Sequence, residues 1–190
     1  SHIMLVGTVS EAFALREEQP DLLLAGERDS FKVDGFDFGN SPAALLDAAL
    51  ADRNLVLTTT NGVRATFHAI GYGPTLVTGY RSADAVVSWL RRRVATESWN
   101  RVNLHASNPT GDDDLACAEY IRAGLLGCEG PSPGQVVDRI RTSESAQKFI
   151  DPGQPEFDER DLDLSARRVD VDGVMVVEQA GPRLRLVEAS

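Results

Sequence analysis

Short apolar segments alternate with helical patterns between residues 22 and 125. Four of them predict buried β-strands, namely Leu22–Ala25, Leu55–Thr59, Thr75–Thr78 and Val102–His105. The segments are interpreted as short and largely apolar rather than alternating, which is typical of strands that are covered on both faces. Each strand is followed by a polar loop and then by a helical pattern. The alternation predicts an α/β fold, with a sheet and helices on its faces.

Local signals mark where several of the helices begin. Thr8 and Glu11 have the spacing of a capping box, and a helix is expected over Ala12–Glu18. Ser41 and Pro42 are a typical start, with an N-cap serine followed by proline at the first helical position. That helix is expected to run to Ala51. Further helices are expected over Val63–Ile70, Ala83–Arg93 and Asp113–Leu125.

The last third of the chain follows a different pattern. Two short helices are expected around Gly134–Arg141 and Ser143–Ile150. Residues 151–172 contain eight acidic residues and three arginines, which favours a solvated loop and helix. Two apolar segments, Val174–Glu178 and Leu184–Val187, flank five residues that include a Gly-Pro pair. They predict a closing C-terminal hairpin.

The length and charge restrict the classes of protein that fit. A chain of 190 residues is interpreted as a single domain over residues 5–190, because Ser1–Met4 resembles the remnant of an expression vector. The 19 Lys and Arg against 29 Asp and Glu give a net charge of −10. That charge repels nucleic acid and anionic membranes, so neither is expected as a partner. No apolar run approaches the roughly 18 residues that span a membrane.

The two cysteines, Cys117 and Cys128, are too few for a disulfide framework. They are interpreted as reduced residues of a cytoplasmic protein. The sequence does not determine whether the protein is a monomer or a homo-oligomer.

Candidate functional residues follow the predicted strands, where loops lead into helices. Gly26-Glu27-Arg28 places a carboxylate beside a guanidinium, and Thr58–Gly62 places hydroxyls and an amide before a helix. Gly35–Pro42 is a glycine-rich loop that leads into a capped helix, an arrangement suited to anions. Gly111–Asp114 offers oxygen ligands for a hard cation such as Mg²⁺. If these loops share one edge of the sheet, they form a phosphate and metal site.

Each of these segments also has a purely structural interpretation. Asn40-Ser41-Pro42 can cap a helix without any ligand, and Thr59-Thr60-Asn61-Gly62 can be a strand end and a turn. Asp112–Asp114 can be an acidic first turn that complements the helix dipole. Asp170-Val171-Asp172 fits the Asp-x-Asp pattern of haloacid-dehalogenase phosphatases, but the apolar strand that this pattern needs does not precede it. The prediction of a functional site therefore depends on the loops converging.

Three of these motifs together closely resemble the 2-phosphosulfolactate phosphatase family. They are Gly26-Glu27-Arg28, the loop Gly35–Pro42 and the turn Thr58–Ala65. The likeness extends through Ser82–Val86, Asp112–Ala118 and Val169-Asp170. The resemblance implies a three-layer α/β/α sandwich with a mixed, largely parallel sheet. It also implies Mg²⁺-dependent removal of phosphate from 2-phospho-3-sulfolactate, a step of coenzyme M biosynthesis in methanogens.

The sequence departs from the family pattern in two places. Family members typically have a strand and an Asp-x-x-Arg-Ala-Thr-Thr loop upstream of the position that matches Leu5, and this sequence has neither. The acidic motif reads Asp113-Asp114-Leu115-Ala116-Cys117, where the family usually has Glu-Asp followed by Cys-Ala-Gly. The expected alternative to an enzyme is a non-catalytic anion-binding or assembly protein on the same scaffold.

The resemblance and the charges suggest a division of roles for a small phosphorylated anionic substrate. The phosphate is expected to bind at Asn40, Ser41, Thr59, Thr60, Asn61 and Gly62. Arg28 and Arg64 are expected to offset a second anionic group, a sulfonate or a carboxylate. Mg²⁺ is expected at Glu27, Asp37 and Asp114. The residues expected to be catalytic are Asp37, Glu27 and Arg28.

Overall fold

The chain forms two compact units. The computed structural model describes residues 2–48, 50–108 and 110–190. The first unit comprises Ser1–Val77 and Met175–Glu188, and the second comprises Thr78–Val174 with Ala189–Ser190. Along the chain, Thr78–Val174 of the second unit stands between the two parts of the first.

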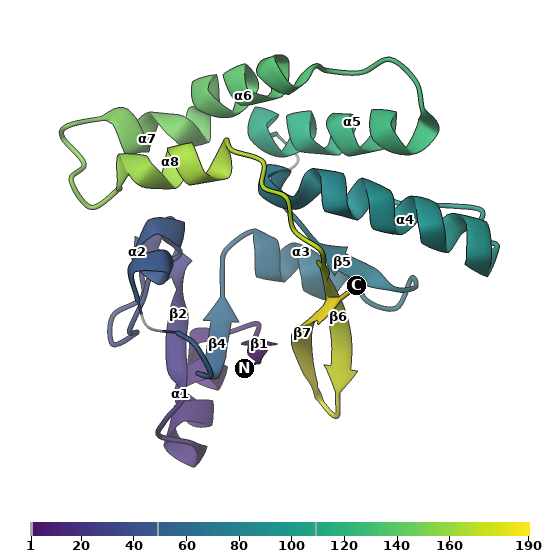
Figure 1. Ribbon diagram of the computed structural model, residues 1–190. Coiled ribbons are helices and arrows are strands. Elements are labelled where there is room, and N and C mark those ends of the chain that lie inside the picture. Colours follow the sequence, from purple (N-terminus) through teal and green to yellow (C-terminus); the bar gives the residue numbers. More distant parts are fainter. Residues whose placement is uncertain (1, 49, 109) are drawn as a thin grey trace. The chain divides into compact units, whose positions relative to one another are not determined.

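The first unit is built around a mixed β-sheet. In the described residues the strand order is β3-β2-β4-β1-β7-β6-β5 (Figure 1). The strands are β1 Ile3–Leu5, β2 Leu23–Arg28, β3 Phe31–Lys32, β4 Leu55–Thr58, β5 Thr75–Val77, β6 Val174–Ala180 and β7 Arg183–Ala189. Strands β2, β4 and β1 are parallel neighbours, whereas β3, β7 and β5 pair antiparallel with β2, β1 and β6. The α/β class, the mixed sheet and the C-terminal hairpin are confirmed.

Strand β1 lies inside the sheet, between β4 and β7. Ile3 is paired with Leu55 on one side and with Leu186 on the other. Met4 is likewise opposite Val56 in β4. Two residues of the segment interpreted as a vector remnant are therefore part of the sheet.

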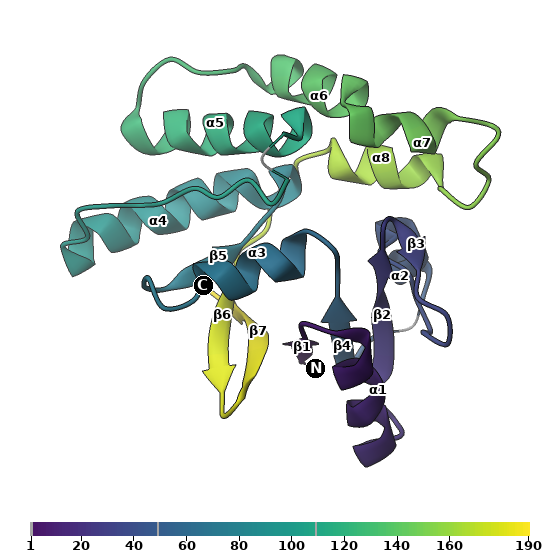
Figure 2. The ribbon, with the colours of Figure 1, turned by 180° about the vertical axis from the view of Figure 1, so that it is seen from behind.

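One helix covers each face of this sheet. Adjacent strand residues point to opposite faces. On one face Leu24 and Val56 form a buried cluster with Leu15 of helix α1 (Val9–Glu18). On the other face Leu5 is buried with Val63 of helix α3 (Gly62–Ala69). This layering explains why β1, β2 and β4 carry apolar residues on both faces (Figure 2).

The second unit is helical in the residues that the structure describes. Its elements are η1 Tyr80–Ser82, α4 Ala83–Glu97, α5 Asp112–Leu126, α6 Pro133–Thr142, η2 Glu144–Ala146, α7 Gln147–Ile150 and α8 Glu159–Ser165. Helix α5 packs against both α4 and α6, and α7 packs against α8. On α4 the buried residues Val86, Trp89 and Leu90 recur at helical spacing, so this face packs into the unit.

Four of the expected elements differ from the structure. Strand β2 runs from Leu23 to Arg28 and not from Leu22 to Ala25, so Gly26-Glu27-Arg28 is the end of the strand and not a loop after it. Val102–His105 is irregular and not a strand, because the sheet lies in the first unit and nothing in the described second unit pairs with this segment. Helix α2 covers Pro42–Asp47 and ends where Ala48 turns extended, before the expected Ala51; residue 49 lies outside the described residues. The β6–β7 loop has two residues, Gly181 and Pro182, and not five, because Gly181 adopts a φ of 65° that permits a tight turn.

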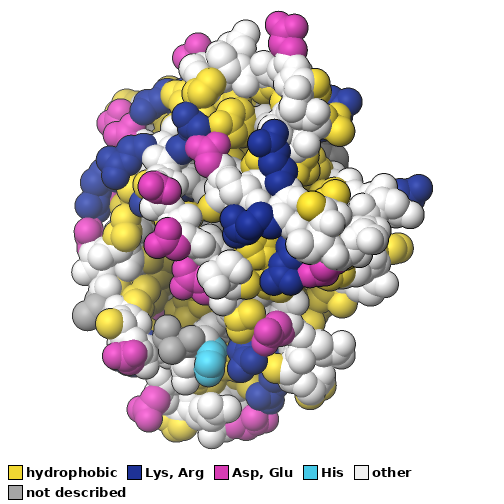
Figure 3. Space-filling model, turned by 45° about the vertical axis from the view of Figure 1, so that its right-hand side comes forward, with side chains coloured by type: hydrophobic (Ala, Val, Ile, Leu, Met, Phe, Trp, Pro, Cys, Tyr) yellow, Lys and Arg dark blue, Asp and Glu magenta, His cyan; other side chains and the backbone are white. Residues whose placement is uncertain are grey.

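The surface carries charges of both signs. Figure 3 shows Lys and Arg side chains interspersed with Asp and Glu over one face, with hydrophobic side chains between them. On that face the net charge of −10 is therefore not gathered into a patch of one sign. Among the helices that the structure describes, none has the length and apolar character needed to cross a membrane.

The two cysteines are both free and are expected to react at very different rates. Burial raises the pKa of the Cys117 thiol to about 12, and the nearby Asp114 adds to that shift. Cys128 is exposed. Because the thiolate is the reactive form, N-ethylmaleimide at about pH 8 should label Cys128 rapidly and Cys117 only after unfolding. Peptide mass spectrometry over time measures both rates, and equal rates in the folded protein would contradict this environment for Cys117.

Candidate anion site at the ends of two parallel strands

The carboxyl ends of β2 and β4 approach each other unusually closely. Gly26 is paired with Thr58 in the parallel register. A Cβ atom on Gly26 would lie 2.0 Å from the Thr58 carbonyl oxygen, and Gly26 has a φ of +151°. Only glycine therefore fits this position. The close approach brings the loop after β2 against the loop after β4.

The Glu27 carboxylate ties these two loops together. Glu27 is 8% exposed. Its Oε1 accepts a hydrogen bond from the Thr60 backbone N–H at 2.5 Å, and its Oε2 accepts from the Thr60 hydroxyl at 2.9 Å. The Ser30 backbone N–H donates to the same Oε2 at 2.9 Å. Hydrogen bonds to an ionised carboxylate are stronger than neutral ones, so Glu27 fixes the shape of both loops.

Arg28 adds a positive charge to the same place. Its guanidinium donates to the Thr58 hydroxyl at 2.8 Å, to the Glu27 carbonyl at 2.7 Å and to the Gly7 carbonyl at 3.4 Å. These partners are all neutral oxygens. Among the described residues, no carboxylate in contact with Arg28 cancels its charge. The guanidinium is thus held in a fixed position with its charge available to an anion.

Helix α3 begins in the loop that Glu27 holds. The Thr59 hydroxyl accepts a hydrogen bond from the Val63 N–H at 2.9 Å and so satisfies one of the first N–H groups of the helix. Asn61 makes no side-chain capping bond and is exposed, as are Gly62 and Arg64. Arg64 donates to the Asn61 side-chain oxygen at 3.3 Å. An amide, backbone N–H groups and a guanidinium therefore face solvent at a helix N-terminus, where anions are favoured.

The loop Gly35–Pro42 runs beside β2. Phe38 forms a parallel bridge with Ala25, and its carbonyl accepts a hydrogen bond from the Gly26 N–H at 3.1 Å. Because the bridge is parallel, the chain continues towards the carboxyl end of β2. There Ser41 accepts a hydrogen bond from the Ala44 N–H at 3.1 Å and caps α2. Figure 1 shows α2 beside the end of β2 to which the arrow points, the same end at which β4 leads to α3.

The expected metal ligands each have their own hydrogen-bond partners. Asp37 accepts from the Leu24 N–H at 2.7 Å and is paired with Arg16, so it anchors its loop to the middle of β2. Asp114 belongs to the second unit, where it accepts from the Ser107 hydroxyl at 2.7 Å and the Asn108 N–H at 2.8 Å. In the part of the chain that the structure describes, no group of three or more His, Cys, Asp or Glu side chains is close enough to hold a metal ion.

Several partners of the candidate residues were not predicted from the sequence. Arg16 was read only as part of a helix, yet it neutralises Asp37. Ser30 donates to Glu27 from a tight turn in which both Asp29 and Ser30 have positive φ, at 51° and 77°. A two-residue polar turn between β2 and β3 was the only signal in the sequence, and it is a weak one.

Comparison with known proteins identifies the family. The family model described as 2-phosphosulpholactate phosphatase matches residues 1–155. A protein of Bacillus subtilis named as a probable 2-phosphosulfolactate phosphatase is 38% identical over 179 residues, which cover 94% of this chain and 78% of that protein. Proteins with the same name from Deinococcus radiodurans and Thermus thermophilus are 36% and 35% identical over 66% and 67% of this chain.

The matched part of the chain spans only 52% and 54% of the lengths of those last two proteins. The family match itself includes every loop of the candidate site described above, from Gly26 to Arg64. Together with the likeness to the Bacillus subtilis protein, it shows that this chain belongs to the 2-phosphosulpholactate phosphatase family.

Proposed function

We propose that this chain hydrolyses the phosphate ester of 2-phospho-3-sulfolactate, or of a similar small phosphorylated hydroxy acid, at the carboxyl ends of β2 and β4. The observation that carries the proposal is the Glu27 carboxylate, whose hydrogen bonds to Thr60 and Ser30 hold the two loops together. Two of the motifs that resemble the family lie here, Gly26-Glu27-Arg28 at the end of β2 and the turn Thr58–Ala65 after β4. The names of the relatives support the same substrate.

The phosphate is proposed to bind at the N-terminus of α3. Asn61 and Gly62 would donate to its oxygens, while Thr59 and Thr60 hold the loop in shape through the bonds described above. Asn40 and Ser41 are proposed to flank the phosphate from the neighbouring loop. The free cysteines support a reducing compartment, and we place the reaction in the cytoplasm.

The two arginines are proposed to bind the substrate's negative charge. Arg28 is fixed by neutral partners, and Arg64 is exposed beside Asn61. One guanidinium would pair with the sulfonate or carboxylate, and the other would stabilise charge on the phosphoryl group as it is transferred. Because both positions are set before the substrate arrives, little reorganisation is needed during the reaction.

Dependence on Mg²⁺ is proposed from the family resemblance alone. The carboxylates expected to hold the ion do not fit a shared site in the first unit. Glu27 already accepts three hydrogen bonds, and Asp37 is paired with Arg16. No step of the reaction is therefore derived through the ion. Loss of activity in EDTA and its recovery with Mg²⁺ would support the dependence, and full activity in EDTA would refute it.

Replacing Arg64 by alanine tests the site directly. Loss of one hydrogen-bonded charge is expected to lower kcat/KM for 2-phospho-3-sulfolactate by about 10-fold to 100-fold. Arg53→Ala is a matched control, since Arg53 is also an exposed arginine and donates to the Asp21 carbonyl. Arg53 stands just before β4, at the end of that strand opposite to the candidate site. Released phosphate is the readout for turnover, and calorimetry with the same compound measures binding.

Three results of this experiment would count against the proposal. If kcat/KM falls equally in Arg64→Ala and Arg53→Ala, the arginine charge acts through the stability of the fold or through the long-range electrostatic field, and not by contact with the substrate. Unchanged kinetics in Arg64→Ala would remove Arg64 from the site. Tight binding of the phosphorylated compound by the unmodified chain without any release of phosphate would favour a non-catalytic anion-binding protein.

A further inference from the structure

The second unit contains a cavity that the proposed function does not use. Its volume is about 460 Å³, which is within the usual range for small-molecule sites. One wall is a face of α4, and the other is the segment 168–172 that leads from α8 towards β6. The polar residues that line it are Asp84, Ser88, Arg92, Arg168, Asp170 and Asp172.

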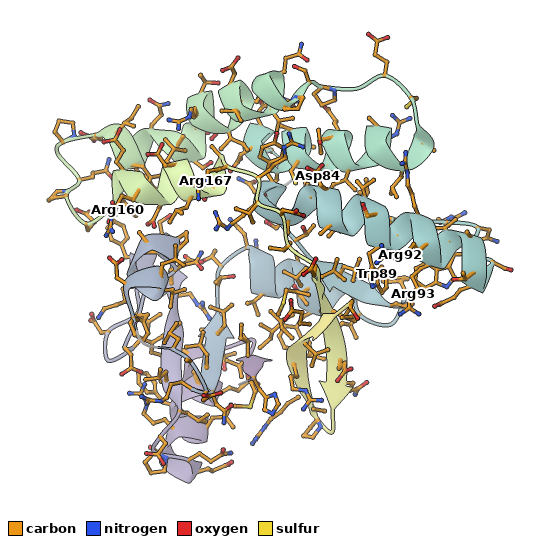
Figure 4. The ribbon with its side chains drawn as sticks, viewed as in Figure 1. Asp84, Trp89, Arg92, Arg93, Arg160 and Arg167 are labelled. Carbon is orange, nitrogen blue, oxygen red and sulfur yellow. The ribbon has the colours of Figure 1, made fainter. Side chains whose placement is uncertain are left out.

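The α4 wall presents its polar residues in one row. Asp84, Ser88 and Arg92 are each four residues apart, so they lie on the same face of the helix. Figure 4 shows Asp84 near the start of α4 and Arg92 further along the same helix. The row therefore runs from a negative group, through a hydroxyl, to a positive group.

Arg168 is held rigidly at the cavity wall. Its Nη1 donates to the Asp84 carboxylate and to the Tyr120 hydroxyl, the latter at 2.6 Å. Its guanidinium lies over the rings of Tyr80 and Tyr120, 5.9 Å and 5.4 Å from their centroids. Burial raises the pKa of Tyr120 to about 12, so the phenol stays protonated and donates to Asp84 at 2.7 Å. Both of these hydrogen bonds use Nη1, so the Nε and Nη2 donors of Arg168 have no partner among the residues that the structure describes.

The remaining charges around the cavity are not paired with each other. Asp84 offsets Arg168. The side chains of Arg92, Asp170 and Asp172 have no hydrogen-bond or ion-pair partner among the residues that the structure describes, although all three line one cavity. Once Asp84 and Arg168 are counted as a pair, an anion alone would be repelled by Asp170 and Asp172, and a cation alone would be repelled by Arg92. A molecule that carries one positive and one negative group can place each group beside side chains of the opposite charge.

We propose that this cavity binds a small zwitterion of the amino-acid type. Its anionic group pairs with Arg92 and the free edge of Arg168, with the Ser88 hydroxyl as a further donor. Its protonated amine pairs with Asp170 and Asp172. Ala85, Val169 and Val171 supply the apolar part of the lining, against which a short side chain can pack. This site is independent of the one proposed for phosphate ester hydrolysis.

The test uses the full chain and the twenty proteinogenic L-amino acids as probes. Each is added at about 5 mM in a thermal melt, and those that raise the melting temperature are titrated by calorimetry. Propionate and propylamine serve as probes with one charge only. We expect at least one amino acid to bind, and both one-charge probes to bind at least about 10-fold more weakly.

Two pairs of variants locate the binding. Arg92→Gln and Asp170→Asn should each weaken binding of that amino acid at least about 10-fold, because each removes a charge-assisted hydrogen bond. Arg101→Gln and Asp138→Asn are controls, since both residues are exposed in the second unit and lie outside the cavity lining. They should leave the affinity unchanged. Three results would each overturn the proposal. They are that no amino acid binds, that propionate or propylamine binds as tightly as the amino acid, or that the two cavity variants keep the affinity of the unmodified chain.

Discussion

Replacing Gly26 by alanine is expected to leave almost no folded first unit. The new methyl group would lie 2.0 Å from the Thr58 carbonyl oxygen, and a backbone atom of a central strand cannot move aside as a flexible side chain can. The φ of +151° is also one that alanine rarely adopts. Relieving the clash would require β2 and β4 to separate, with loss of their parallel hydrogen bonds. The cost should exceed about 4 kcal/mol, a large share of the roughly 5–15 kcal/mol that stabilises a typical protein.

Denaturant unfolding of the soluble fraction measures this loss. Gly134→Ala is a matched control, because Gly134 lies in α6 and nothing is within 4 Å of the position that its Cβ would occupy. That change should be neutral or stabilise the helix by up to about 1 kcal/mol. A Gly26→Ala protein as stable as Gly134→Ala would show that β2 and β4 do not approach as closely as described.

Replacing Glu27 by glutamine is expected to weaken both the fold and the site. The glutamine has the same shape, but its NH₂ group takes the place of one of the two carboxylate oxygens. That group cannot accept a hydrogen bond, so either the Thr60 N–H or the Ser30 N–H loses its acceptor. A buried donor left without an acceptor costs about 1–3 kcal/mol, and the charge-assisted bonds are lost as well. The melting temperature should fall by about 5–10 °C. Substrate affinity should fall further than stability alone explains, because the loop that begins α3 is no longer fixed.

Glu18→Gln provides the comparison for Glu27→Gln. Glu18 ends α1 and pairs with Arg183 at 3.1 Å, and its side chain is 60% exposed. An exposed pair of this kind contributes at most about 1 kcal/mol. Melting curves and titrations with 2-phospho-3-sulfolactate on both variants separate the two effects. If both variants behave alike, Glu27 does not organise the loops.

Elements with local signals were predictable from the sequence. The capping box of Thr8 and Glu11 is present at the start of α1, and Ser41 caps α2 as expected. Strand β4 and helices α3 and α5 lie close to their predicted ranges, whereas β2 and α4 begin near the expected residues and run further. In each case the capping residues or the apolar pattern lie within the element itself. The convergence of Gly26–Arg28 with Thr58–Gly62 also followed from the rule that parallel strands end at one edge.

Features that depend on distant partners were not predictable. The apolar pattern of Val102–His105 suits a strand, but a strand needs a neighbour and the described second unit offers none. The role of Asp37 depends on Arg16 and on the Leu24 N–H, and neither contact is visible in the spacing of the motif. The pairing of β5 with β6 was likewise hidden, because the helices of the second unit separate these strands along the chain.

The position of β1 has a consequence for synthesis on the ribosome. β1 is made before the second unit, yet one of its two partners, β7, is made after it, since Ile3 pairs with Leu186. The sheet cannot be completed until the β6–β7 hairpin has left the exit tunnel. The helices of the second unit are contiguous in sequence over Thr78–Val174 and depend on no such late partner. A nascent chain should therefore be able to form its helical insertion before β1 gains its partner β7, whereas β2 and β4, whose neighbours all precede the insertion, can pair earlier.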